Sequence, residues 1–525
     1  MSNRYSNLEP NGRPTKAAKP NKKWTWISIA IVLALCAIVI PVVVVLFNRD
    51  HSNTRASSRS SSSTNKNLSN STSTSTLKLA PKKKWNFSND KLIGLNLGNW
   101  LILERWMNED WFTDNAGPHS WDEWDFTTAL GPKAVDVLEE HWSTWVTEAD
   151  VERAYQAGIN TFRVPVPFWM WIPTTGSEPY LAGRQMAHFE RLCSYAYARD
   201  MYIIIDLHGL PGSQNGEQQS GRNTTSPTFW QPLQQARSDQ TVKAVVDWLA
   251  QSPYASIISA IEAVNEPRPY TPSQLAMLRS YYERTYKTIQ TLGANAPAMM
   301  FADGFVKGDK FSYWYDFAKS HQTDPPSLIF TDHPYPGYFP AQNNTRDIFN
   351  QTCTDAAKYI NFPVPTAITE WSLRTGIQNS TFEKEYYSYQ LTAWTWFAGS
   401  CFWSIRALDS KISVLADPVA QYQWSFESLL ARGSIPTPNI NGTTKDTKAI
   451  TTQFITDLGT PCGPAPALNS GAGIPQTAAA AAAVTAAQEA EALIPKLEAD
   501  ELAAAKSFGL VGIGSDAVMV SAKSK

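Results

Sequence analysis

Two carboxylate residues of the chain have surroundings that suit acid–base and nucleophilic chemistry. Glu266 lies in AVNEPRP (263–269) and Glu370 in ITEW (368–371), and each follows an apolar run. Hydrolysis of a glycosidic bond needs two facing carboxyl groups, because one protonates the leaving oxygen and the other attacks the anomeric carbon or activates water. A negative charge on one raises the pKa of the other, which keeps a proton available near neutral pH.

Further polar and aromatic residues stand at the ends of apolar runs. A single histidine or tryptophan in such a place is structural more often than functional, but repetition over six runs favours a site. We expect Arg163 to keep Glu370 ionised and Tyr335 to donate a hydrogen bond to it. Asn265 would bind a sugar 2-hydroxyl, and Trp403 would form an apolar floor for a sugar ring. The run-end residues are Arg163, Asp206, His208, Asn265, Glu266, His333, Tyr335, Glu370, Trp371 and Trp403.

Eight short apolar runs supply the strands that must position these residues, and helical patterns lie between several of them. In VTEADVERAYQAG (146–158), Val151, Ala154 and Tyr155 form an apolar stripe, and Gly158 is placed to end the helix. The alternation predicts an α/β fold, a (β/α)8 TIM barrel whose strand ends converge on one mouth. A doubly wound open sheet is the alternative, but no GxGxxG follows the first strand. The runs are 92–98, 161–167, 202–209, 258–267, 297–305, 327–335, 366–371 and 400–406.

Composition and charge exclude several classes of protein. The chain has 525 residues, with 45 Lys and Arg against 47 Asp and Glu and a net charge of −2. This balance excludes a strongly basic nucleic-acid binder and an acidic solvating chain, so no nucleic-acid partner is expected. Eighteen of the 20 tryptophans lie between Trp85 and Trp424, which places the folded domain there.

The first residues have the pattern of a membrane anchor. Residues 1–25 are basic, and no charged residue occurs among the 21 residues from Ile27 to Phe47. At about 1.5 Å per residue such a helix spans roughly 30 Å, the thickness of a bilayer core. We expect a cytoplasmic tail at 1–25 and a transmembrane signal-anchor helix at 26–47, hence a single-pass type II protein of the cell membrane with its main domain outside. A cleaved signal peptide is the alternative.

The segments on either side of the predicted domain differ from it in composition. Residues 48–84 are rich in Ser and Thr and predict an extended stalk. Residues 463–525 are rich in Ala; they have helix-forming composition but little to build a core, so we expect an appendage. N-glycosylation sequons, which suit an extracellular surface, occur at Asn67, Asn70, Asn86, Asn223, Asn343, Asn350, Asn379 and Asn441.

Cysteine and histidine spacing gives no sign of a metal site. Cys193, Cys353, Cys401 and Cys462 follow the predicted anchor and would face an oxidising compartment, where a disulfide is plausible. Four cysteines allow three full pairings, and the sequence does not choose among them. No CxxC or HExxH spacing occurs, so neither a metal nor another cofactor is expected.

Eight ordered motifs resemble those of the fungal exo-β-1,3-glucanases of glycoside hydrolase family 5, and the resemblance covers roughly Trp85 to Cys462. The membrane anchor and stalk resemble those of the membrane-bound members of this group. The motifs are GLNLGNWLILERWM (94–107), HWSTWVTEADV (141–151), FRVPVPFW (162–169), IIDLHGLPGSQNG (204–216), AVNEPRP (263–269), DHPY (332–335), ITEW (368–371) and FWSIRA (402–407).

The resemblance implies a barrel at 85–462, a retaining double displacement and β-glucan as the substrate of a monomeric enzyme. By motif, Glu266 matches the acid/base and Glu370 the nucleophile, and Glu104 matches an acidic residue that holds the terminal glucose. Cys353 and Cys462 match a family disulfide, which leaves Cys193 and Cys401 free and buried. The residues that match those around the reacting sugar are Arg163, His208, Asn265, His333, Tyr335 and Trp403.

One departure from the family pattern concerns the mouth of the barrel. Glu217-Gln218 stand where the family usually has Phe-Asp, of which the Phe clamps the leaving sugar. Tyr338 could supply an aromatic wall instead. Three hypotheses follow: release of glucose from the non-reducing end of β-1,3-glucan during cell-wall remodelling; the same chemistry on β-1,6-glucan or as transglycosylation; and a non-catalytic wall-binding barrel.

Overall fold

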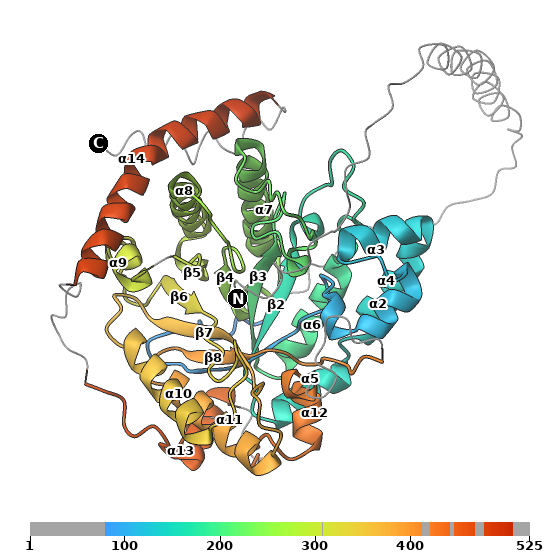
Figure 1. Cartoon of the computed structure of the whole chain (residues 1–525). Helices are drawn as coiled ribbons and strands as arrows, with labels where there is room; N and C mark the ends of the chain where they lie inside the picture. Colours follow the sequence, from blue (N-terminus) through green and yellow to red (C-terminus); the bar gives the residue numbers. More distant parts are fainter. Residues whose placement is uncertain (1–78, 307, 412–420, 441–445, 468–476, 508–525) are drawn as a thin grey trace, which may run out of the picture. The chain divides into compact units, whose positions relative to one another are not determined.

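Eight parallel strands form a closed barrel, with each strand paired to the next along the chain and the last paired to the first (Figure 1). The computed structural model describes residues 79–306, 308–411, 421–440, 446–467 and 477–507. The predicted (β/α)8 barrel is therefore confirmed. The strands are β1 Leu92–Asn96, β2 Thr161–Pro167, β3 Tyr202–Gly209, β4 Ile258–Glu262, β5 Ala298–Ala302, β6 Leu328–Asp332, β7 Thr366–Trp371 and β8 Gly399–Phe402.

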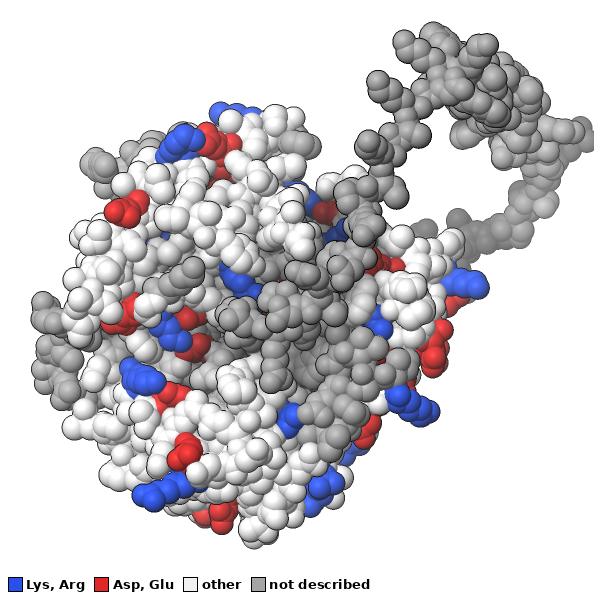
Figure 2. Space-filling view, in the orientation of Figure 1, with Lys and Arg blue, Asp and Glu red and all other residues white. Residues whose placement is uncertain are grey.

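Helices surround the barrel and bury their apolar faces against it (Figure 1). On the face drawn in Figure 2, charged residues of both signs lie in small groups among uncharged ones. The described α-helices are α2 Glu109–Ala116, α3 Glu123–Leu130, α4 Ala134–Thr144, α5 Glu148–Gln156, α6 Met186–Ala198, α7 Pro232–Gln251, α8 Pro272–Gln290, α9 Lys310–Ser320, α10 Thr345–Tyr359, α11 Ser380–Trp394, α12 Phe426–Ala431, α13 Thr447–Leu458 and α14 Ala478–Ser507.

The predicted runs match the strands, but five of the eight strands end earlier than their runs. β4 ends at Glu262, and the apolar residues after it belong to the loop that leads to Glu266. The predicted helix at 146–158 is α5, which begins with a capping box between Thr147 and Asp150 and ends before Gly158, whose φ is 87°. Gly158 ends this helix because a residue without Cβ adopts a positive φ at little cost.

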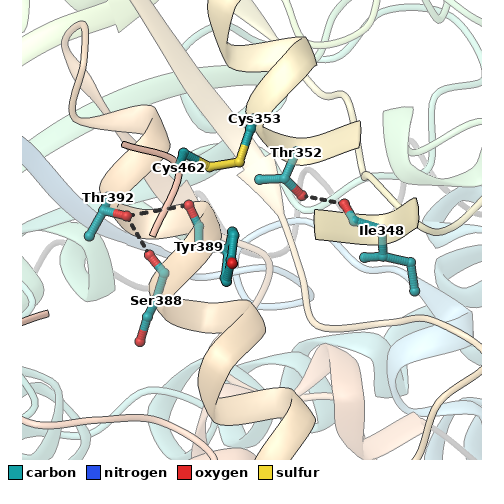
Figure 3. Close-up of a disulfide and its surroundings, with 7 residues drawn as sticks. All are labelled: Ile348, Thr352, Cys353, Ser388, Tyr389, Thr392 and Cys462. Carbon is teal, nitrogen blue, oxygen red and sulfur yellow. Dashed lines mark hydrogen bonds between the residues drawn. A yellow bond between two sulfur atoms is a disulfide. The ribbon is translucent and has the colours of Figure 1, made fainter. Parts of the chain in front are cut away.

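A disulfide joins Cys353 of α10 to Cys462, which follows α13, across 109 residues of sequence. This is the pair that the family resemblance implied. Thr352 of α10 and Tyr389 of α11 lie beside it (Figure 3). Among the described cysteines, Cys193 and Cys401 are buried and form no disulfide.

The Ala-rich segment forms α14, which packs along α7, α8 and α9 (Figure 1). Its buried alanines are spaced three or four residues apart, at Ala480, Ala483, Ala487 and Ala490, so one helix face can approach closely. Two arginines of α8 pair with it: Arg279 Nη2 lies 2.5 Å from Glu491 Oε1, and Arg284 Nη2 lies 2.9 Å from Glu501 Oε2. The expected appendage is thus a docked helix in the part that the structure describes.

Several predictions concern segments outside the described residues, namely the cytoplasmic tail at 1–25, the anchor at 26–47, nearly all of the stalk, parts of the Ala-rich tail (468–476 and 508–525), and the sequons at Asn67, Asn70 and Asn441. Within the described residues no helix is long and apolar enough to cross a bilayer. The other sequon asparagines lie on the surface or close to it, with Asn223, Asn343, Asn350 and Asn379 exposed and Asn86 half-buried.

Replacing both Cys353 and Cys462 by Ser should lower the free energy of unfolding by about 2–4 kcal/mol, because the open chain regains the entropy that a long closed loop removes. Denaturant unfolding of the double variant and the wild type measures this difference. Cys193→Ser, at a buried thiol outside the disulfide, is the control for loss of a buried sulfur. A double variant as stable as the wild type would show that the disulfide contributes nothing.

Candidate active site

Arg163 lies at the centre of the barrel on β2 and is fully buried. Its guanidinium forms ion pairs with three carboxylates: Nε to Glu262 at 2.6 Å, Nη1 to Glu370 at 2.9 Å and Nη2 to Asp206 at 3.1 Å. It also donates to the side-chain oxygens of Asn96, at 2.9 Å, and Asn265, at 2.8 Å. Burial alone would lower the pKa of Arg163, but the charges of the three carboxylates raise it well above the ordinary value.

Glu370 is the next-to-last residue of strand β7, and both of its carboxylate oxygens accept hydrogen bonds. Oε1 accepts from Arg163 Nη1 at 2.9 Å, and Oε2 accepts from the Tyr335 hydroxyl at 2.7 Å. Both contacts match the sequence-based expectation. Trp371, the next residue, lies instead against Phe402 and Tyr387, so it is a core residue.

Glu266 lies in the loop after β4, with φ at 42°. Few side chains favour this left-handed conformation. Neighbouring amides hold the turn: Asn215 donates to the Glu266 carbonyl at 3.2 Å and Gln214 to the Asn265 carbonyl at 3.0 Å. Tyr335 has φ at 42° as well. Backbone strain of this kind is common at functional sites.

His333 lies between the two carboxylates. Its Nδ1 is 2.9 Å from Glu266 Oε1 and 3.4 Å from Glu370 Oε2, and its Nε2 is 3.0 Å from the Thr369 hydroxyl. One ligand-type atom from each of Glu266, His333 and Glu370 lies within 4.8 Å of the others. The structure thus brings the two predicted carboxylates to opposite sides of one small space.

The charges in this space set the protonation of each group. Burial raises the pKa of Glu370, the charge of Glu266 adds to the effect, and the charges of His333 and Arg163 oppose it. Burial also acts to raise the pKa of Glu266, but the hydrogen bond and charge of His333 outweigh it, and the pKa is lowered. Burial would lower the pKa of His333; Glu370 and Glu266 instead raise it to about 9. His333 therefore holds a proton next to Glu266.

A second group of predicted residues lies beside Asn265. His208 pairs through Nδ1 with Asp206 at 2.6 Å, and the indole of Trp403 stacks on it with ring centres 5.6 Å apart. Glu104 accepts from Trp106 Nε1 at 2.9 Å through Oε2, whereas its buried Oε1 has no hydrogen-bond partner among the described residues. Burial raises the pKa of Glu104 to about 7. Its open acceptor is suited to a sugar hydroxyl.

The same residues could hold a metal only at an electrostatic cost. Glu266, His333 and Glu370 have the spacing of metal ligands, although the sequence predicts no cofactor. A cation there would have to displace the His333 proton and lie close to the positive charge of Arg163. The donor set fits two-carboxylate chemistry better than metal binding.

Some residues of this site are not among those predicted from the sequence. Glu262 is fully buried and accepts from both Arg163 and the Thr331 hydroxyl, at 2.6 and 2.8 Å. Asn96 donates to backbone carbonyls of β7 and β8 as well as accepting from Arg163. A charged residue inside an apolar run, as in ISAIE, is the signal that could have identified Glu262.

The chain belongs to glycosyl hydrolase family 5, since the family profile described as Cellulase (glycosyl hydrolase family 5) matches residues 127–408. It is similar to the Probable glucan 1,3-beta-glucosidase A of Neosartorya fischeri, at 38% identity over 41% of this chain and 50% of that protein. It is also similar to the Glucan endo-1,6-beta-glucosidase B of Emericella nidulans, at 26% identity over 68% of this chain and 88% of that protein.

Solved structures agree on the fold. The rutinosidase from Aspergillus niger superposes with a TM-score of 0.60 and 23% identity, over 67% of this chain and all of that one. The chain spans about half the length of the 1,3-beta-glucosidases it matches, so its own activity and substrate are inferred from the site.

The raised pKa of His333 predicts a pH-dependent contribution to stability. Its pKa in the folded protein is about 9 against about 6.5 in an unfolded chain. The stabilisation is therefore complete below pH 6.5 and is lost as the pH rises through 9. The difference in unfolding free energy between the wild type and His333→Gln should shrink by on the order of 3 kcal/mol from pH 6 to pH 10.

Denaturant unfolding at several pH values measures this difference, with His119→Gln at an exposed histidine as the control. If the difference in unfolding free energy between the wild type and His333→Gln stays constant from pH 6 to pH 10, the charge on His333 does not stabilise the fold.

Proposed function

We propose that the chain is a retaining β-glucan hydrolase that releases glucose from the non-reducing end of β-1,3-glucan in the fungal cell wall. The observation that carries the proposal is the spacing of Glu266 and Glu370, whose nearest oxygens lie within 4.8 Å of each other. Retaining enzymes hold their carboxyl groups about 5–5.5 Å apart, whereas inverting enzymes need roughly 6.5–9.5 Å to admit a water. The names of the 1,3-beta-glucosidase relatives support the linkage.

In this mechanism Glu370 is the nucleophile. Arg163 and Tyr335 fix both of its oxygens and favour the ionised form. Its carboxylate attacks the anomeric carbon while Glu266 gives a proton to the glycosidic oxygen, so the bond to the leaving sugar breaks. Glu266 then takes a proton from water, the water oxygen attacks the same carbon, and the bond to Glu370 breaks with net retention.

The proton for the first step comes from the pair that Glu266 forms with His333. The two share one proton across 2.9 Å. A sugar bound over the pair would exclude water, and removal of water disfavours the charged form of an ion pair. The proton then moves from His333 Nδ1 to Glu266 Oε1, where the leaving oxygen needs it.

Exo-action is supported by the polar group beside Asn265. Glu104 Oε1, which has no hydrogen-bond partner among the described residues, lies 4.0 Å from His208 Nε2, so one sugar hydroxyl could bind both atoms. Buried polar groups of this kind favour a chain end, which presents more hydroxyls than an internal unit.

A β-1,6-glucanase is the second candidate. This chain aligns with 88% of the length of the endo-1,6-beta-glucosidase relatives, but with only about half of the length of the 1,3-beta-glucosidases. Transglycosylation uses the same intermediate with a sugar hydroxyl in place of water. A non-catalytic wall-binding protein would not need the ion pairs that hold Glu370.

We further propose that residues 26–47 anchor the protein in the cell membrane with the barrel on the cell-wall side. The uncharged run and the basic residues before it support this. The stalk and the sequons that follow suit an extracellular position.

Glu370→Gln should abolish turnover of β-1,3-glucan, and Glu266→Gln should reduce it by about 10²–10⁴-fold, because the first loses the nucleophile and the second the acid. On an aryl β-glucoside, whose leaving group departs without an acid, azide should restore turnover of Glu266→Ala with β-glucosyl azide as product, and turnover of Glu370→Ala with the α-anomer as product. Proton NMR of the products gives both rate and anomer. An α-anomer as the first product of the wild type would contradict a retaining mechanism.

The linkage is tested by product analysis on linear β-1,3- and β-1,6-glucan. Glucose alone from the β-1,3 polymer supports an exo-β-1,3-glucanase. A ladder of oligosaccharides would contradict exo-action, and turnover of the β-1,6 polymer alone would favour the second candidate. Binding without any products would favour the wall-binding hypothesis.

A further inference from the structure

An ion pair lies on the rim of the site next to Glu266. Arg268, two residues after Glu266, reaches Glu217 Oε1 through Nη1 at 2.7 Å. The two side chains are 21% and 40% exposed, so each keeps hydrogen-bonding groups open to a ligand.

This ion pair is held in place from several sides. Asn215 accepts from the Glu217 backbone N–H at 3.0 Å and donates to the Glu266 carbonyl, so one side chain links the pair to Glu266. The Arg268 backbone N–H donates to the Gln214 carbonyl at 3.1 Å. The Arg268 guanidinium lies over the Phe305 ring, 5.1 Å from its centre, and that ring is 42% exposed.

The position of the pair indicates which part of a substrate it meets. In the proposed mechanism Glu266 protonates the leaving oxygen, so the groups around Glu266 face the leaving sugar. Gln219, in the same loop as Glu217, points its amide at Glu266 Oε2 from 3.5 Å. The Glu104 and His208 group lies beside Asn265 and meets the glucose that is transferred.

We propose that Glu217 and Arg268 form a specificity-determining pair that binds the hydroxyls of the sugar on the leaving-group side, and of an acceptor sugar that replaces it. This inference rests on the proposed function. A guanidinium donates and a carboxylate accepts, so together they match a pair of neighbouring hydroxyls. The open part of the Phe305 ring can cover the apolar face of the same sugar.

A purely structural role is the competing interpretation. A partly exposed ion pair contributes about 0–1 kcal/mol to stability and could do no more than hold its loop. The two roles differ in their effect on an acceptor, because only a binding pair changes how much sugar is needed to capture the intermediate.

The test uses β-glucosyl fluoride as donor and the β-1,3-linked disaccharide laminaribiose as acceptor. The fluoride leaves without occupying the leaving-sugar position, and the intermediate then divides between water and acceptor. Both routes use Glu266 as the base, so an indirect effect through Glu266 cancels in the ratio of transfer to hydrolysis. Chromatography of products against acceptor concentration gives that ratio.

Glu217→Gln and Arg268→Gln should each need about tenfold more laminaribiose to reach the wild-type ratio of transfer to hydrolysis. This is the effect expected from losing one hydrogen bond to a charged group. Arg184→Gln is the matched control, because Arg184 forms a similar ion pair with Glu139 at 2.9 Å on the outside of the barrel. Glu217→Phe should lower transfer to laminaribiose and raise activity on aryl β-glucosides, whose leaving group stacks on an aromatic ring.

A wild-type ratio in Glu217→Gln and Arg268→Gln at every acceptor concentration would overturn the proposal, as would a wild-type protein that hydrolyses the fluoride but never transfers to laminaribiose. If the wild type releases no fluoride at all, the proposed function itself fails. Thermal unfolding of each variant excludes loss of fold as the cause.

Discussion

The rest of the site depends on a single buried positive charge. The guanidinium of Arg163 lies inside the barrel within 3.1 Å of Asp206, Glu262 and Glu370, which come from β3, β4 and β7. Three carboxylates at such distances would repel one another, and burying them without a partner would cost several kcal/mol each. Arg163 is the common partner whose positive charge offsets the three negative ones. It therefore joins strands that are far apart in the sequence into one rigid floor under the site.

This arrangement explains why Glu370 and Glu266, which have identical side chains, differ in how their carboxylates are held. Glu370 is bound on both oxygens, by Arg163 and Tyr335, and so is held in one orientation. Glu266 receives its main contact from His333, which also approaches Glu370. The Glu370 carboxylate is held on both oxygens, whereas the Glu266 carboxylate is hydrogen-bonded to an imidazole. The asymmetry comes from position, because Glu370 lies within strand β7 and Glu266 lies in the loop after β4.

The sequence predicts the barrel and most of the site because the apolar runs mark the strands and polar residues stand within or just after them. The eight apolar runs identify the strands, and the polar residues near their ends lead to Glu370 and Tyr335, since parallel strands of a barrel present their carboxyl ends to one mouth. Arg163 was also identified from its run, although it is the third residue of β2 and does not lie at the carboxyl end of that strand. Glu262 was missed because its partner, Arg163, lies on another strand, and the composition of β4 alone does not show that the Glu262 carboxylate is neutralised there. Arg268 was missed because its partner Glu217 lies on another loop. The docking of α14 depends on Arg279 and Arg284, which look like ordinary surface residues in the sequence of α8.

The left-handed backbone at Glu266 has an evolutionary consequence. At a φ of 42°, Gly or Asn would be less strained than Glu, so replacing Glu266 by either would relax the turn while removing the carboxyl group. Substitutions of Glu266 that relax the turn should therefore stabilise the fold even though they remove the carboxyl group. Gene copies freed from selection for turnover should lose this residue early and still encode a stable barrel.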